Sequence, residues 1–257
     1  MKSALHAEWT KLRTAPGTGW LLLVVVVLTV GLSWLATAAV HFQARELQDQ
    51  VKISLVGVQA GQAVVAVLGV LIITGEYSSG MIRSTLAAMP QRWPMLAAKA
   101  TVLTGLVLLA GAVAVLGSLM LAGFIMPGNG FTAANGFPAL SLTDPETLRA
   151  TAGSILYLTL IGLLSLGLAT LIRDSALAVG VVLGVLYLFP ILIQVVGDPD
   201  WKRRLEQIGP TSAGLGIQST VDLQSLAISP WMGMGVLAAW ATTAMVAAAV
   251  MLRWRDA

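Results

Sequence analysis

The stretch from residue 20 to residue 40 reads WLLLVVVVLTVGLSWLATAAV and contains no charged residue. At 21 residues it is long enough to cross the roughly 30 Å hydrocarbon core of a bilayer as an α-helix, which takes about 20 apolar residues. Five more charge-free runs of similar length follow in the 257-residue chain. The predicted spans are residues 20–40, 53–73, 100–126, 150–172, 175–197 and 231–252.

The composition favours the same class of protein. Hydrophobic residues make up 57% of the chain and charged residues 11%, whereas soluble domains carry roughly 25% charged residues. Backbone groups in lipid must be satisfied within the spanning segment, and the runs lack the short alternating pattern of barrel strands. We therefore predict an all-α polytopic membrane protein of six transmembrane helices, with residues 1–257 forming a single transmembrane domain.

The distribution of charge predicts the orientation. Six spans place both termini on one side of the membrane. If that side is cytosolic, the inside segments hold nine of the 15 basic residues and the outside segments six, as the positive-inside rule requires. A cleaved signal peptide is disfavoured because Glu8 precedes the first apolar run, which exceeds the usual 7–15 residues of a signal core. We expect both termini to be cytosolic.

Residues 1–14 are predicted to form a helix in the headgroup layer. Met1, Leu5, Trp9 and Leu12 fall on one stripe at helical spacing, and basic residues such as Lys11 and Arg13 accompany it. A basic tail that only enforces orientation is the alternative interpretation.

The segment from Glu76 to Arg92 is the longest mixed-polarity connector on the expected cytosolic side. Drawn as a helix from Tyr77 to Met89, it has two apolar stripes with Arg83 between them. One stripe holds Ile82, Leu86 and Met89, and the other holds Tyr77, Met81 and Ala88. Such a helix can pack on the bundle and on a soluble partner at once, although a helix resting on the headgroups would show the same pattern.

The charge at the start of this connector is expected to have two stabilising interactions. Glu76 at the start of the predicted helix favours the helix dipole, and it is a candidate ion-pair partner for Lys11 or Arg13.

The second span carries polar and small residues. Gln59 and Gln62 lie on one face, and they either bond to a neighbouring helix or line a wet pathway. Gly57 and Gly61 have the spacing of close helix–helix contacts, which Gly180 and Gly184 repeat in the fifth span.

The region around the fifth span and its following loop suggests further structure. Pro190 is expected to kink the fifth span. In the loop 198–230, residues 201–208 resemble a short amphipathic helix, and residues 219–228 either lie on the membrane or form a solvated cap.

The sequence lacks the motifs of several kinds of chemistry. It has no phosphate-binding loop, no cysteine and only two histidines, so we expect neither catalysis nor a cofactor or metal bound by this chain. Among the titratable residues in the predicted spans, only Tyr157 and Tyr187 are candidates to matter, which disfavours ion-coupled transport because such carriers place charges inside the membrane.

Three segments in order carry a resemblance to a known family. They are residues 8–14 (EWTKLRT), residues 76–83 (EYSSGMIR) with Pro90, Gln91, Arg92 and Lys99, and residues 252–257 (LRWRDA). The chain resembles the membrane permeases of type-2 ATP-binding-cassette transporters, mostly bacterial exporters. Met81 departs from the family, which more often has a small hydroxyl residue there.

The resemblance implies a permease subunit in the cytoplasmic membrane of a bacterium. Its expected partners are a separate nucleotide-binding ATPase, which would hold ATP and Mg, a second permease copy and membrane lipids, but no nucleic acid. It also implies a re-entrant element before the sixth span. The residues expected to couple to the ATPase are Glu76, Tyr77, Met81, Ile82, Arg83, Leu86 and Arg92, with Trp9, Lys11 and Arg13 in the interfacial helix.

Two alternatives remain: a stand-alone secondary transporter or channel, and a non-transporting immunity or scaffold protein. The sequence does not indicate the substrate.

Overall fold

A computed structural model describes residue 10 and residues 16–43, 48–78 and 92–254 of the chain. All regular elements in these residues are helical, which confirms the all-α prediction. Six helices are long and apolar enough to cross a membrane, so the chain is a multi-pass membrane protein by length and composition. They are Gly17–Ala39, Val58–Tyr77, Trp93–Asn129, Pro145–Ile172, Ser175–Val195 and Pro230–Trp254.

The long elements are α2 (Pro16–Ala39), α4 (Val58–Ser78), α6 (Arg92–Ile125), α7 (Pro145–Ile172), α8 (Ser175–Leu183) and α12 (Pro230–Trp254). The helix α8 continues through the π-helical turn η3 (Gly184–Leu188) into α9 (Phe189–Val195). The shorter elements are α3 (Gln50–Ser54), η1 (Met126–Asn129), η2 (Ala133–Asn135), α10 (Pro199–Ile208), α11 (Pro210–Leu215), η4 (Gly216–Gln218) and η5 (Leu223–Ser225).

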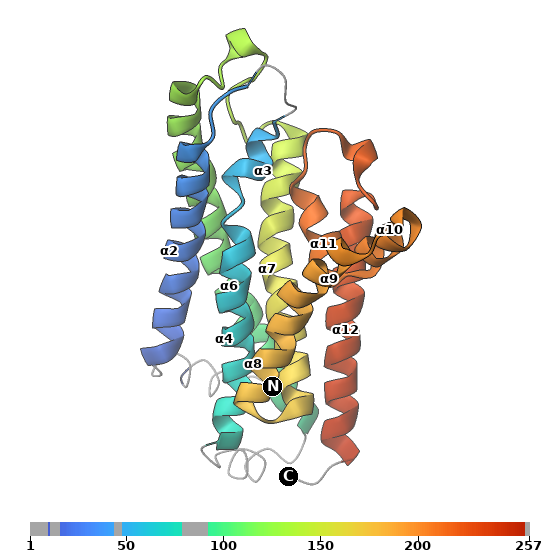
Figure 1. Ribbon diagram of the computed structural model, residues 1–257. Helices are drawn as coiled ribbons and strands as arrows, with labels where there is room; N and C mark the ends of the chain where they lie inside the picture. The colour runs from blue at the N-terminus through green and yellow to red at the C-terminus, as the bar shows by residue number, and fades with distance from the viewer. Residues whose placement is uncertain (1–9, 11–15, 44–47, 79–91, 255–257) are drawn as a thin grey trace.

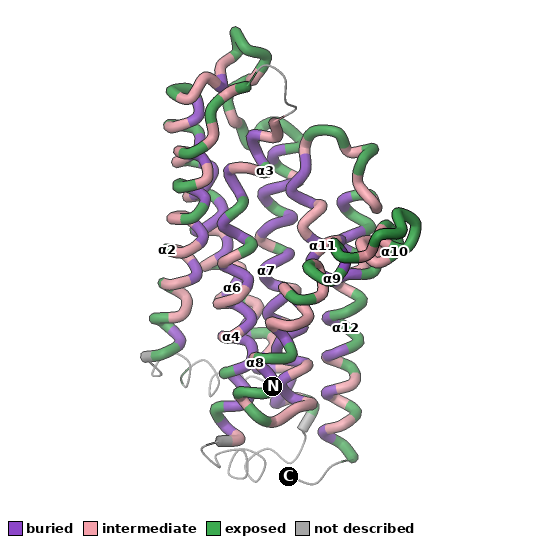
Figure 2. The backbone as a smooth tube through the Cα atoms, viewed as in Figure 1, coloured by how far each residue is buried: buried purple, intermediate pink, exposed green. Residues whose placement is uncertain are grey.

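The helices α4 and α7 form the centre of the bundle. In each, 61% of the most apolar window is buried, against 22–39% in the other four spans. They pack against each other, and α2, α6, α8 and α12 surround them (Figures 1 and 2). The core therefore centres on the two most buried helices.

The start of α2, the end of α4, the start of α6 and the end of α12 all lie at the lower end of the bundle in Figure 1. We name this the connector end, because residues 79–91 join α4 to α6 there. The first and the last span thus have their outer ends on the same side of the bundle, as expected for six spans. That this side is cytosolic stays a prediction.

The second span begins five residues later than predicted. Residues 50–54 form the separate helix α3, capped by Asp49, whose carboxylate accepts the Lys52 amide at 3.0 Å. A turn follows, and α4 starts at Val58. A Cβ atom on Gly57 would overlap the Thr29 carbonyl of α2, so the chain turns where the two helices meet most closely. The close contact predicted for the Gly57/Gly61 pair is confirmed, whereas Gly180 and Gly184 have no neighbour within 4 Å of an added Cβ.

The third and fourth spans begin earlier than predicted, because charged residues near their starts are helical. The helix α6 starts at Arg92 rather than residue 100, and α7 starts at Pro145 rather than residue 150. The side chain of Asp144 caps α7 by accepting the Thr147 amide at 2.9 Å, which satisfies one free backbone donor of the first turn.

The fifth span accommodates Pro190 by a local change of helix type. The π-helical turn η3 immediately precedes α9, in whose first turn Pro190 lies. A proline removes one backbone donor and its ring crowds the preceding turn, and a π-turn is a recognised way to absorb such a defect. The structure thus places a π-turn next to Pro190, and the kink itself stays a prediction.

Candidate functional site

A buried ion pair joins the two helices that flank residues 79–91. Glu76, in the last turn of α4, lies 2.7 Å from Lys99 (Oε1 to Nζ), in the second turn of α6. Their side chains are 6% and 1% exposed. The Lys99 ammonium also lies 3.5 Å from the Ile72 carbonyl, one turn back along α4. Because burial strips both charges of water, their mutual attraction offsets part of the cost of dehydration.

A second contact ties α4 to the junction between α7 and α8. The Arg173 guanidinium lies over the Tyr77 ring, 5.5 Å from its centroid. Arg173 caps α7 in the left-handed conformation, with φ of 64°, and the Asp174 carboxylate next to it caps α8 by accepting the Leu177 amide at 2.8 Å. Both caps hold the junction in one shape, so Tyr77 meets a guanidinium whose backbone is fixed.

Together these contacts form what we name the connector clamp: Glu76, Tyr77, Lys99 and Arg173. The ion pair closes a loop between residue 76 and residue 99, so a force on the intervening chain reaches α4 and α6 together. The cation–π contact extends that connection to α7 and α8. Mechanically, the clamp joins four of the six spans at the connector end.

The structure corrects two predictions about Glu76 and Tyr77. Both residues belong to α4 and do not begin a separate connector helix. Glu76 consequently lies in the last turn of α4, where the dipole disfavours a carboxylate, so the predicted dipole stabilisation is wrong. Glu76 forms an ion pair with Lys99. The suggested partners Lys11 and Arg13 lie outside the described residues, so their pairing with Glu76 stays a prediction.

The remaining predicted coupling residues are largely outside the described part of the chain. Arg92 is the first residue of α6. The others that fall outside are Trp9, Met81, Ile82, Arg83 and Leu86, along with most of the predicted Tyr77–Met89 helix and the interfacial helix 1–14. Their roles stay predictions.

The two glutamines of α4 have different environments. Gln62 is fully buried, and its side-chain oxygen accepts a hydrogen bond from the Tyr157 hydroxyl of α7. Gln59 is exposed, and its backbone carbonyl accepts the Tyr187 hydroxyl from η3. Gln62 thus joins the two central helices, which supports the structural interpretation. Within the part of the chain that the structure describes, the Gln62 amide nitrogen has no hydrogen-bond partner.

The chain between the fifth and sixth spans packs into the bundle. The amphipathic helix predicted at 201–208 is confirmed as α10. The next segment, α11 with η4, is mostly buried, and it contacts α7 and α12 (Figure 1). A Cβ atom on Gly214 would overlap the Tyr157 ring, and one on Gly233 of α12 would overlap the Ala213 carbonyl. The part of this loop that is buried in the bundle is therefore residues 210–218, and residues 219–228 are mostly irregular. The predicted re-entrant element stays a prediction.

Sequence reasoning did not find that Lys99 and Arg173 face α4. Both residues lie immediately outside predicted spans, 100–126 and 150–172, whose ends fall at charges because an unpaired charge inside a membrane is costly. One signal was available: Glu76 and Lys99 lie close to the two ends of the same connector, where an acidic and a basic residue can meet.

The described residues contain no group of three or more His, Asp or Glu side chains that could hold a metal ion. The connector clamp thus offers charge and shape rather than metal ligands.

No protein-family model matches the chain, and no curated protein is detectably similar to it.

Proposed function

We propose that this chain is the membrane subunit of an ATP-driven exporter and that it works as a dimer with two separate ATPase subunits. The observation that carries the proposal is the connector clamp, in which the Glu76–Lys99 pair joins the helices on both sides of residues 79–91. A connector that only links two spans does not need an ion pair between its flanking helices. A connector that receives force from a partner does need one, because the force must reach both helices.

The proposed mechanism is rigid transmission. Closure of the ATPase on nucleotide pushes the connector, and the ion pair makes α4 and α6 move as one body. The close packing of Gly57 and Gly61 on Thr29 passes the movement from α4 to α2. Rocking of these helices then changes access to a cavity at the dimer interface.

The roles proposed for individual residues follow this path. Arg83 and Arg92, with the apolar residues Met81, Ile82 and Leu86, contact the ATPase, while Glu76 and Tyr77 pass its movement into α4. The interfacial residues Trp9, Lys11 and Arg13 steady the start of α2 in the headgroup layer. ATP and Mg bind to the partner, because this chain has no phosphate-binding loop.

The direct test is co-purification with a phosphate-loop ATPase. We expect the tagged chain to retain such a subunit in mild detergent and Arg83→Glu to release it, with loss of lipid-stimulated ATP turnover. Arg203→Glu in α10 is the charge-matched control and should leave both unchanged. If Arg83→Glu and Arg203→Glu behave alike, the connector is not the docking surface.

A stand-alone transporter is the second candidate, and the clamp itself favours it. Glu76 and Lys99 place charges at the ends of two spans, although the predicted spans contained none. Carriers driven by ions use charges in such positions. Flux in liposomes that contain only this chain, driven by a proton or sodium gradient, would favour this candidate and would contradict the ATP-driven proposal.

A further inference from the structure

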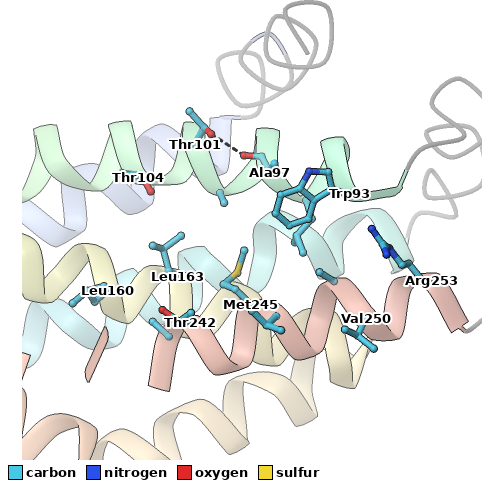
Figure 3. Close-up of a pocket in the computed structure, with 15 residues that line it drawn as sticks. Trp93, Ala97, Thr101, Thr104, Leu160, Leu163, Thr242, Met245, Val250 and Arg253 are labelled. Atoms are coloured by element: carbon cyan, nitrogen blue, oxygen red, sulfur yellow. Dashed lines mark hydrogen bonds between the residues drawn. The ribbon is translucent and has the colours of Figure 1, made fainter. Parts of the chain in front are cut away.

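A groove runs between α6 and α12 with α7 as its floor. Both outer helices pack on α7, and they leave a cavity of about 690 Å³ between them. Leu160 and Leu163 of α7 form the floor, and Figure 3 shows Thr104 of α6 and Thr242 of α12 toward one end. Binding pockets for small ligands typically enclose roughly 300–1,000 Å³, so the groove can hold a molecule rather than a single water.

The groove has the length of one membrane leaflet. Its lining extends from Trp93 to Thr104 along α6 and from Ala241 to Arg253 along α12. At about 1.5 Å per residue, these stretches are roughly 17 Å and 18 Å long. Half of the roughly 30 Å hydrocarbon core is about 15 Å. A hydrocarbon chain that lies in this groove would therefore reach from the membrane surface to about the bilayer centre.

The walls of the groove are almost entirely apolar. Alanine, leucine, valine and methionine side chains from the three helices make up most of the lining. The Thr101 hydroxyl, which also lines the groove, donates to the Ala97 carbonyl of its own helix at 2.8 Å (Figure 3). That donor is satisfied without a ligand, so the wall suits hydrocarbon.

The charged residue and the indole of the groove lie at its connector end. Trp93 and Arg253 lie there on facing helices (Figure 3). Arg253 is exposed and has no ion-pair partner among the described residues, and Trp93 is 59% exposed. Indole rings favour the headgroup zone of a bilayer, and a guanidinium forms strong two-point hydrogen bonds with phosphate.

We propose that the groove binds one acyl chain of an anionic phospholipid, with the lipid phosphate on Arg253. An apolar slot of one leaflet's depth, with Arg253 as the cation that the described lining places at its surface end, matches an anionic headgroup above a hydrocarbon tail. A second copy of the chain would fit less well, because its apolar face would bury the Arg253 charge without a counter-charge. The inference does not depend on the proposed export function.

Native mass spectrometry of the purified full chain with added lipid tests this site. The probes are phosphatidylglycerol and phosphatidylcholine with identical acyl chains. We expect the chain to retain phosphatidylglycerol preferentially, and Thr242→Trp, which fills the groove, to lower that retention about tenfold, the ratio that corresponds to about 1.4 kcal/mol. Thr243→Trp is the matched control, since the neighbouring residue is exposed but does not line the groove.

The headgroup part of the site is tested separately. Arg253→Gln should remove the preference for phosphatidylglycerol over phosphatidylcholine, whereas Arg203→Gln in α10 should keep it. Every variant must elute as the wild-type species with unchanged helix content, which excludes misfolding.

Two results would overturn the proposal. One is equal lipid retention by the Thr242→Trp and Thr243→Trp variants. The other is a change from dimer to monomer in Thr242→Trp with lipid retention unchanged, which would assign the groove to a second copy of the chain.

Discussion

Removing the charge of Glu76 should destabilise the bundle more than removing other acidic charges, because the change leaves Lys99 buried without its carboxylate. The variant Glu76→Gln keeps the size and shape of the side chain. At 2.7 Å and an effective dielectric constant of about 20, the attraction between two unit charges is about 6 kcal/mol. Dehydration of both groups cancels part of this attraction, and breaking one buried pair by removing one partner typically costs about 3–5 kcal/mol.

The measurement is reversible unfolding in mixed micelles, followed through the fluorescence of the eight tryptophans. We expect Glu76→Gln to lower the free energy of unfolding by about 3 kcal/mol or more. Glu146→Gln is the control, because Glu146 is exposed in the first turn of α7, and its loss should change the free energy by less than about 1 kcal/mol.

A double variant separates the ion pair from local packing. Glu76→Gln combined with Lys99→Met removes both charges, and replacing a whole buried pair by uncharged groups is often neutral or stabilising. The double variant should therefore be more stable than Glu76→Gln alone. The single variant Lys99→Met completes the comparison. If the losses of stability in Glu76→Gln and in Lys99→Met simply add in the double variant, or if Glu76→Gln behaves like Glu146→Gln, the buried charges do not stabilise each other and the clamp has no mechanical role.

Two further predictions concern the packing and the capping of the bundle. Gly57→Ala should lower the free energy of unfolding by about 1–3 kcal/mol, because the added Cβ overlaps a backbone carbonyl of α2. Gly180→Ala, in the open face of α8, should be neutral or stabilising. Thermal unfolding of both variants in one detergent compares them, and equal shifts in the unfolding temperature would contradict the close contact of Gly57 with α2. The Thr147 amide and, second, the Thr147 hydroxyl donate hydrogen bonds to the Asp144 carboxylate and hold its pKa below the ordinary value of 3.8. The capping contribution of Asp144 is therefore complete above about pH 4 and fades as the pH falls through the folded pKa. Asp144→Ala should accordingly cost about 1 kcal/mol near neutral pH, and its difference from the wild type should shrink as the pH falls through the folded pKa; a difference independent of pH would exclude the carboxylate as its cause.

The class of fold could be predicted from the chain because it depends on long apolar runs, which need no knowledge of neighbours. Two of the predicted ends agree closely with the structure: the fourth span ends at Ile172, and the fifth begins at Ser175. There a pair of charges, Arg173 and Asp174, falls in the turn itself and forms both helix caps. Where the charges lie at a real turn, a boundary drawn at a charge is correct.

The same rule failed where a charge has a partner. Lys99 was treated as the end of a cytosolic segment, yet it is 1% exposed within α6, since Glu76 offsets the cost of its burial. The rule also failed at residues 53–57, where the run contains no charge but the chain turns to bring Gly57 onto α2. Both errors come from contacts between helices, and a single sequence shows the residues without showing which of them meet.

These boundary shifts change the proposed mechanism. A separate helix that began at Glu76 would pass force to the bundle through a hinge, and part of any movement would be lost in bending. In the structure Glu76 and Tyr77 are the last turn of α4, one of the two central helices, and that helix continues without interruption to Val58. Force applied at residues 79–91 would therefore reach the packing of Gly57 and Gly61 on α2, at the opposite end of α4, through one rigid rod about 30 Å long. Breaking the Glu76–Lys99 pair should then uncouple α6 from this rod while α4 and α2 still move together, a difference that distance measurements between labelled helices can detect.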